Sequence, residues 1–190
     1  ALLYFINNID DEVAYEHARK SLLPNAAIFV VLFVAYVVFL LVTKGYDVDP
    51  TTGAVSLVQY KYLHNFLAMP LILVVFLVGV VLVLAGVILT LVKKGFRKGI
   101  WLEGVGVVLA VLGLLLILGY NNTAYYPSIA DINSSLTIQN SSSSPYTLKA
   151  MSIVSLLIPF VLAYIFYAWR AIDRKKITRH EMGQDEEIKY

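Results

Sequence analysis

Cysteine is absent from the 190-residue chain, and charged side chains are scarce. Without cysteine, the chain cannot hold a disulfide, a cysteine-ligated zinc ion or an iron–sulfur cluster. Hydrophobic residues make up 59% of the chain and charged residues only 15%, which departs strongly from the balance of a soluble domain. A domain of this size leaves much of its surface exposed, so one soluble core cannot bury this apolar excess. The composition therefore indicates that a lipid bilayer surrounds the protein.

The net charge of +2 is too small to suggest a nucleic-acid partner. The start of the chain also lacks the basic segment of a signal peptide, and it is apolar over Ala1–Ile6. We therefore expect an N-terminally truncated chain, in which residues 1–25 are the end of a preceding helix and a cytoplasmic connector. In this connector we expect a short helical stretch, which stops at a turn at Pro24 and Asn25.

Four long apolar runs predict an all-α membrane protein, with four transmembrane helices forming one bundle over residues 26–170. A span needs about 17–25 mostly apolar residues. In lipid the backbone must satisfy its own hydrogen bonds, so a helix is expected even where valine and phenylalanine are frequent. The predicted spans are residues 26–43, 70–92, 100–119 and 148–169. Residues 44–69 read as a loop with an interfacial aromatic segment.

The distribution of cations predicts the orientation. The turn 93–98 holds four cations and no acid, and the tail 171–190 begins with further cations, whereas the loop 120–146 has neither Lys nor Arg. Because cytoplasmic loops carry the excess of Lys and Arg, we expect the turn and the tail to be cytoplasmic and the loop outside. Counting back along the chain, residues 44–69 lie outside and the segment around Arg19 lies inside.

None of the histidines indicates a haem or metal site. His17 and His180 lie in charged segments and His64 in the predicted interfacial segment, so none lies within an apolar run, where a haem would need its ligand. No pair has the spacing of metal ligands. Glu103 and Lys149 are ionisable residues near span ends. Glu103 is a candidate for a proton path, although a carboxylate near a helix N-terminus is also stabilised without any function, and Lys149 can extend its amine to the interface.

Small and helix-breaking residues within the spans favour a packing role. Five glycines suit close helix contacts: Gly79, Gly86, Gly104, Gly106 and Gly113. Pro159 should kink the fourth span, which could serve packing or make room for a cofactor. Three asparagines of the outer loop fit the N-glycosylation pattern, which is meaningful only in a eukaryotic protein: Asn121, Asn133 and Asn140. The residues thus predict no catalytic, cofactor-binding or metal-binding site, and they favour a scaffold or partner subunit.

Several segments together resemble subunit II of the cytochrome bd quinol oxidases. The similar segments are the start of the chain, which matches the end of the family's fourth helix and the turn after it, the outer loop, the last helix and the tail: residues 1–20, 126–128, 133–137, 143–151, 159–169 and 177–190. Many members of that family carry Trp-Asp where this chain has Gln139 and Asn140. No acidic role at that position is therefore transferred to this chain.

The resemblance implies an eight-helix subunit made of two four-helix bundles, of which this chain is the second. It implies a heterodimer with subunit I, which carries haems b and d and oxidises quinol while oxygen is reduced to water. It also implies a multi-pass protein of the bacterial cytoplasmic (inner) membrane, in contact with lipid and with quinone. The acids proposed for proton transfer in this family's subunit II lie in its first half, so no catalytic residue is transferred.

Two other functions remain open from the residues alone. Half of a polytopic transporter, or a scaffold module without a redox role, would have polar or helix-breaking residues near the midplane of paired helices, and only Pro159 qualifies. A eukaryotic four-span adhesion protein would be expected to carry cysteines in its outer loops, and the chain has none.

Overall fold

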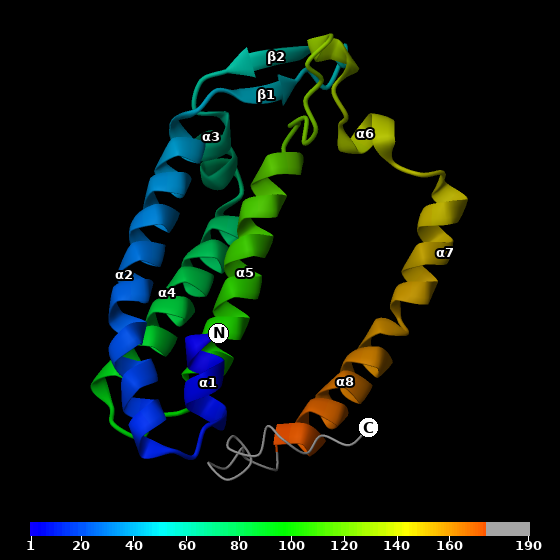
Figure 1. Ribbon diagram of the computed structural model, residues 1–190. Coiled ribbons are helices and arrows are strands. Elements are labelled where there is room, and N and C mark those ends of the chain that lie inside the picture. The colour runs from blue at the N-terminus through cyan, green and yellow to red at the C-terminus, as the bar shows by residue number, and fades with distance from the viewer. Residues whose placement is uncertain (174–190) are drawn as a thin grey trace.

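The computed structural model describes residues 1–173, and the part of the predicted tail from residue 174 onward, with His180, lies outside them. Three long helices run side by side and a small cap closes one end of them, while a fourth, broken helix stands to one side (Figure 1). Four helical segments within the described residues are long and apolar enough to cross a membrane. The prediction of an all-α membrane protein with four spans is therefore confirmed.

The first span begins earlier than its apolar run. Helix α2 covers Glu12–Val42, and the Asp11 side chain caps it by accepting hydrogen bonds from the backbone N–H groups of Val13 and Ala14. The predicted turn at Pro24 is wrong, because Pro24 lies inside α2. A proline removes one backbone donor from the helix, but the Asn25 side chain donates to the Ser21 carbonyl oxygen at 2.7 Å and adds a local bond there. At about 1.5 Å per residue α2 exceeds the thickness of the hydrocarbon, so part of it extends into water.

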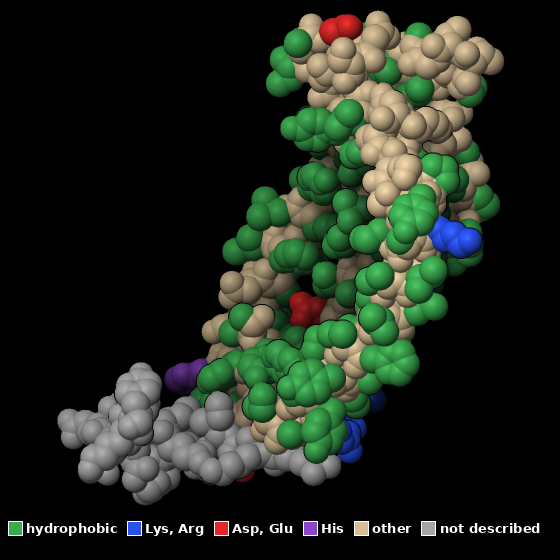
Figure 2. Space-filling model, turned by 90° about the vertical axis from the view of Figure 1, so that its right-hand side faces the viewer, with side chains coloured by type: hydrophobic (Ala, Val, Ile, Leu, Met, Phe, Trp, Pro, Cys, Tyr) green, Lys and Arg blue, Asp and Glu red, His purple; other side chains and the backbone are tan. Residues whose placement is uncertain are grey.

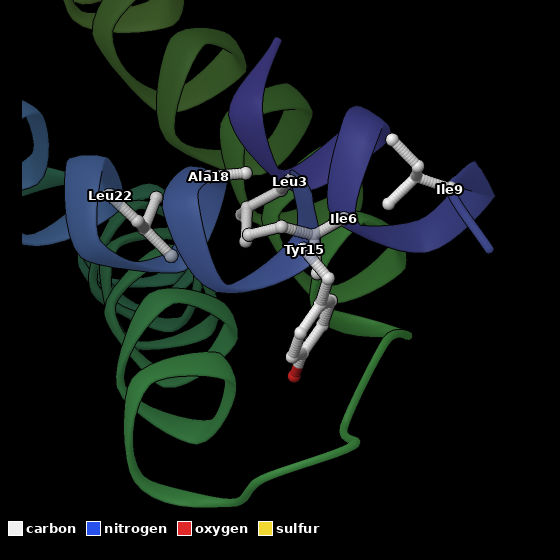
Figure 3. Packing of buried hydrophobic residues seen from close by; sticks show 6 residues of the cluster. All are labelled: Leu3, Ile6, Ile9, Tyr15, Ala18 and Leu22. Carbon is white, nitrogen blue, oxygen red and sulfur yellow. The ribbon is translucent and has the colours of Figure 1, made fainter. Parts of the chain in front are cut away.

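Helix α1 (Leu2–Asn8) folds back against the first turns of α2. Six buried side chains make this contact: Leu3, Ile6, Ile9, Tyr15, Ala18 and Leu22 (Figure 3). Side chains of α4 and α5 pack around the same cluster, among them Leu91 and Ile100. The apolar start of the chain is therefore part of a core that closes one end of the helices.

Helices α4 (Pro70–Val92) and α5 (Gly99–Gly119) form the closest pair, and they coincide with the second and third apolar runs. Glycines let their backbones approach. A Cβ atom at Gly79 would lie 2.7 Å from the Gly106 carbonyl oxygen, and one at Gly86 would lie 2.8 Å from that of Gly99. Small residues at helix contacts of this kind are the usual packing device in membranes.

The loop expected over residues 44–69 contains structure that the sequence did not predict. Strands β1 (Gly45–Val48) and β2 (Val55–Val58) form an antiparallel hairpin, and helix α3 (Lys61–Ala68) follows. The segment 120–144, with a 3₁₀ turn at Ile132–Ser134 and helix α6 (Ile138–Ser141), packs on the hairpin through the bridge between Asp47 and Thr123. We call residues 44–69 and 120–144 together the cap. Both loops predicted to share one side of the membrane therefore meet at one end of the helices.

The fourth span is broken in the middle and stands apart from the other three. Helix α7 (Pro145–Ser155) ends before Pro159, and helix α8 (Ile158–Asp173) continues beyond the break, as the kink predicted for Pro159 requires. The residues 145–167 are exposed throughout. Near its end α8 meets α1, where the rings of Tyr4 and Trp169 pack edge to face with centroids 6.2 Å apart. Hydrophobic side chains dominate the face of the molecule seen in Figure 2.

Candidate functional site

Buried polar groups gather where the cap meets the ends of the helices. Lys61, at the start of α3, is 7% exposed, pairs with Asp47 of β1 and donates to the Asn121 carbonyl oxygen at 2.8 Å. A buried amine requires such partners, because an unpaired charge away from water is costly. The pair ties the hairpin, α3 and the end of α5 together. Sequence reasoning missed this site, since Lys61 and Asp47 both lie in a segment expected to be an irregular loop.

Asn65, one turn after Lys61, is completely buried and fully hydrogen-bonded. Its Nδ2 atom donates to the Ile117 carbonyl oxygen at 2.7 Å and to Thr123 Oγ1 at 2.8 Å, and its Oδ1 atom accepts from Asn121 Nδ2 at 2.9 Å. The Ile117 carbonyl belongs to the last turn of α5, where helix carbonyls lack intrahelical partners. The network therefore supplies the C-terminal end of α5 with a donor.

At the opposite end, two arginines bind backbone carbonyls. Arg19 donates from Nε to the Thr90 carbonyl oxygen at 3.2 Å and from Nη2 to that of Leu91, at the end of α4. Arg97 of the basic turn donates to the Ile9 carbonyl oxygen and lies over the Tyr15 ring, 5.2 Å from its centroid. The tertiary structure thus places Arg19 and the turn 93–98 at the same end, as the charge distribution predicted.

The histidines that the structure describes do not form a site. His17, in the first turns of α2, and His64, in α3, are both exposed. No group of three or more His, Asp or Glu side chains that could hold a metal ion occurs within residues 1–173. Lys149 is exposed on α7, at the end of the span nearer the cap.

Glu103 lies on α5 and lines a cleft of about 650 Å³ between α1, α2, α4 and α5. The rest of that lining is almost entirely apolar, with Asn25 of α2 as its one amide side chain. Glu103 has no hydrogen-bonded or ion-paired partner among the residues that the structure describes. It is therefore an unpaired acid at the depth of the spans, unlike the paired acids at either end.

A second apolar hollow separates α8 from α1 and α5. It has a volume of about 720 Å³, and its lining includes Trp101, Gly104, Val108, Phe166 and Trp169. Gly104 has no atom within 4 Å of a Cβ placed on it, so the chain's own packing does not require a glycine there. We call this hollow the α5–α8 groove.

The three asparagines of the glycosylation pattern are used inside the cap. Asn121 bonds Asn65, and the Asn133 Oδ1 atom accepts from the backbone N–H of Val55 at 3.0 Å. Asn140 closes a capping box with Thr137 and also donates to the Ser135 carbonyl oxygen at 2.9 Å. An aspartate at position 140 would keep the acceptor half of this arrangement but lose the donor, so asparagine has a structural role here.

Comparison with known families now identifies the chain. The family described as cytochrome bd terminal oxidase subunit II matches residues 1–172, which include every element described above apart from the last residue of α8. The chain belongs to this family. No curated protein matches it.

Membership in the cytochrome bd terminal oxidase subunit II family confirms the family that the sequence resembles. The family is that of an oxidoreductase complex, and the four spans make this member a multi-pass membrane protein. The match includes α1 and the first turns of α2, so the α1–α2 hairpin is part of the family domain.

Proposed function

We propose that the chain serves as the non-haem subunit of a cytochrome bd-type terminal oxidase. It assembles with the haem-bearing subunit I, and the complex oxidises quinol and reduces oxygen to water. The observation that carries this proposal is the family match over residues 1–172, together with four apolar spans. The role of the chain is then structural, in that it supports assembly of the partner, rather than catalytic.

The positions of the histidines support a partner that carries haems b and d. Axial haem ligation needs a histidine or a comparable ligand at the depth of the cofactor. His17, in the first turns of α2, and His64, in α3, are both exposed. The haems are therefore assigned to subunit I.

The surface of the spans supports contacts with a partner and with lipid. Helix α2 exposes large apolar side chains along its span, among them Phe29, Leu32 and Phe39, and α7 and α8 do the same. In a membrane, such faces pack against lipid or another subunit. The α5–α8 groove is apolar and lined by aromatic rings, which suits a lipid chain or the isoprenoid tail of a quinone.

We assign the chain to the bacterial cytoplasmic membrane, with the cap outside and the C-terminus in the cytoplasm. Arg19 and the turn 93–98 share one end of the spans. The cap segment 44–69 holds Lys44 and Lys61, but Lys61 is paired with Asp47. The opposite end carries Arg19, Lys20 and the four cations of the turn 93–98, so it holds the excess of Lys and Arg and is the cytoplasmic end by the positive-inside rule.

Purification of the full-length subunit from its native membranes tests the proposal. An affinity tag on this subunit should isolate a second membrane protein together with the absorption bands of b- and d-type haems and quinol-dependent oxygen consumption. Cells that lack the gene for subunit I are the control, and their preparation should lose the haem bands. A stable homo-oligomer without haem, from membranes that contain the partner, would contradict the proposal.

The transporter hypothesis receives little support from the helix geometry. Transporter sites are built from interrupted helices in corresponding halves of the fold. In the described residues α7 and α8 form such an interrupted span, whereas α2 continues through Pro24 without a break. A small solute that raises the melting temperature of the purified subunit without any oxidase partner would favour the transporter hypothesis instead.

A further inference from the structure

The α5–α8 groove has the shape and the lining of a site for a hydrocarbon chain. Its floor follows α5 from Trp101 to Val108, which is seven residues or about 10 Å. Its opposite wall follows α8 from Leu162 to Trp169 over the same number of residues. None of the side chains that line it is charged. The face of the molecule that contains α8 is mostly hydrophobic (Figure 2), so an apolar occupant is favoured.

The side chains of the protein do not fill the groove at Gly104. This glycine lies in the floor, and a Cβ atom placed on it would meet no atom within 4 Å. By contrast, a Cβ atom at Gly106 would lie 2.7 Å from the Gly79 carbonyl oxygen, at the contact with α4. Gly104 therefore does not bring two helices together, and it leaves the groove open.

Aromatic and amide side chains gather at one end of the groove. Both tryptophans of the chain, Trp101 and Trp169, belong to the lining, and Tyr4 packs against the ring of Trp169. Tryptophan prefers the boundary between hydrocarbon and headgroups. Asn7 also lines the groove, and it donates one N–H from Nδ2 to Asn8 Oδ1 at 3.1 Å, which leaves the second N–H for another acceptor. The groove therefore leads from an apolar interior to an end at the level of the headgroups.

Two cations stand beside this end. Lys98 precedes Trp101 by three residues, so it lies on the groove face of α5. Arg170 follows Phe166 by four residues, so it lies on the groove face of α8. Both cations are exposed, and neither forms an ion pair with a side chain that the structure describes. They are therefore available to an anion at the end of the groove.

The arginines of α2 and of the basic turn have other partners. Arg97 lies 3.9 Å from Asp10 and donates to a carbonyl oxygen at the end of α1. Arg19 lies 3.6 Å from Glu16 and donates to carbonyl oxygens at the end of α4. Glu103 and the start of the chain line the cleft towards α2 and α4, and neither the Glu103 carboxylate nor the first α-amino group lines the groove.

From these observations we propose that the groove binds an anionic phospholipid of the cytoplasmic leaflet. An acyl chain lies along α5 past Gly104, the ester groups reach the tryptophans and Asn7, and the phosphate faces Lys98 and Arg170. Basic sites between membrane helices at the cytoplasmic side select such headgroups. The choice of leaflet rests on the proposed orientation, whereas the oxidase assignment does not enter. The readout is therefore bound lipid, and oxygen consumption is not needed.

Native mass spectrometry tests whether the groove holds a lipid. The sample is the full-length subunit with its partners, purified in mild detergent from its own membranes. We expect one more phospholipid on the parent than on Gly104→Phe, whose ring occupies the open space beside Gly104. Val107→Phe, at an exposed position of α5 outside the lining, is the matched control and should retain the lipid. Equal lipid counts on the parent and Gly104→Phe would overturn the proposal, and so would the loss of a quinone in place of a phospholipid.

Competition between headgroups tests the role of the two cations. The same preparation is placed in vesicles of equal parts phosphatidylglycerol and phosphatidylethanolamine, and the lipid that remains after extraction is identified. The parent should retain the anionic lipid over the zwitterionic one by roughly tenfold, because each cation near the membrane surface contributes several-fold. The double variant Lys98→Gln with Arg170→Gln should bring this ratio towards one, whereas Lys94→Gln, in the same turn, should leave it unchanged.

The headgroup variants leave the walls of the groove intact, so they decide the outcome even if Gly104→Phe does not fold. A parent protein without preference for the anionic lipid would overturn the proposal. The same preference in the parent and in the double variant would also overturn it, because the phosphate would then not face these cations.

Discussion

Asn65 Nδ2 lies 2.7 Å from the carbonyl oxygen of Ile117, and this bond joins the cap to the last turn of a membrane span. Neither residue has any solvent exposure. The bond connects two segments that are far apart in the sequence, and it satisfies a carbonyl at a helix end, where intrahelical donors run out. This buried amide therefore helps to attach the cap, beside the packing of Tyr62 and Phe66 on Ile117.

Replacing Asn65 with alanine should destabilise the protein by about 2–4 kcal/mol, because buried partners lose their hydrogen bonds. The affected groups are the Ile117 carbonyl, Thr123 Oγ1 and Asn121 Nδ2. Thermal unfolding of the purified full-length protein in detergent measures the loss. His64→Ala, at the neighbouring exposed position, is the control and should stay within about 0.5 kcal/mol of the parent. Equal melting temperatures for the two variants would contradict the role of Asn65.

Lys61→Met should also loosen the cap, since it removes the ion pair with Asp47 and a hydrogen bond to Asn121. We expect a loss of about 1–3 kcal/mol, reduced by water because the Asp47 side chain is 37% exposed. A double-mutant cycle with Asp47→Asn separates the pair from the other contacts. The double variant should be more stable than the sum of the single losses implies, and strict additivity would show that the pair contributes nothing.

The glycines of α4 and α5 make a matched comparison. A Cβ at Gly79 would meet the backbone of α5, including the Gly106 carbonyl oxygen at 2.7 Å, whereas a Cβ at Gly104 would meet nothing within 4 Å. Gly79→Ala should therefore destabilise the protein by about 1–3 kcal/mol through overpacking. Gly104→Ala should be neutral or stabilising by up to about 1 kcal/mol, because alanine favours the helix. Melting curves measure both, and a stable Gly79→Ala variant would be inconsistent with the close α4–α5 contact.

Pro159→Ala should join α7 and α8 into one straighter helix. Alanine restores the backbone N–H that proline lacks, so the bond to the Ser155 carbonyl becomes available. Because the chain has no native cysteine, two introduced cysteines at positions 148 and 168 can carry spin labels without further changes. The distance between the labels should increase toward about 30 Å, the length of a continuous helix over that interval. Pro145→Ala, at the first turn of α7, is the control and should leave the distance unchanged.

The stability of the turn between β1 and β2 should depend on pH through the carboxyl group of Asp49. Hydrogen bonds, first from the Thr51 side chain, hold the pKa of Asp49 at about 2, below its ordinary value of 3.8. Since the folded-state pKa is lowered, the stabilisation is fully present above about pH 4 and is lost as the pH falls through about 2. A carboxyl-carbon NMR titration measures the pKa in the parent protein and in Thr51→Val, where it should return toward the ordinary value. An unchanged pKa in Thr51→Val would exclude the threonine as its cause.

The spans were predictable because their signal is local. A run of apolar residues long enough to cross a bilayer must form a helix, whatever the rest of the chain does. Residues 70–92 and α4 coincide for this reason. The placement of Arg19 and the turn 93–98 at the same end of the helices followed from the distribution of charge alone. The break at Pro159 followed from its missing donor.

The candidate sites were only partly predictable. Glu103 was singled out as an acid within an apolar run, but its cleft is formed by α1, α2 and α4 together with α5. Lys61 and Asn65 gave no signal, because an isolated lysine or asparagine in a polar loop does not reveal its partners. Lys61 bonds Asn121 and Asn65 bonds Thr123, and each partner lies about sixty residues further along the chain.

The sequence by itself determined the membrane environment, the four spans and their alternation, because hydrophobicity, charge and helix breaking act on neighbouring residues. Only the tertiary structure decided that α2 continues through Pro24, that α1 folds back to close one end, and that residues 44–69 and 120–144 form a joint cap. Those features depend on hydrogen bonds and packing between distant segments. In the sequence Asn65 is one polar residue of a loop. In the fold it is buried, and its amide forms a hydrogen bond that holds the cap to the membrane helices.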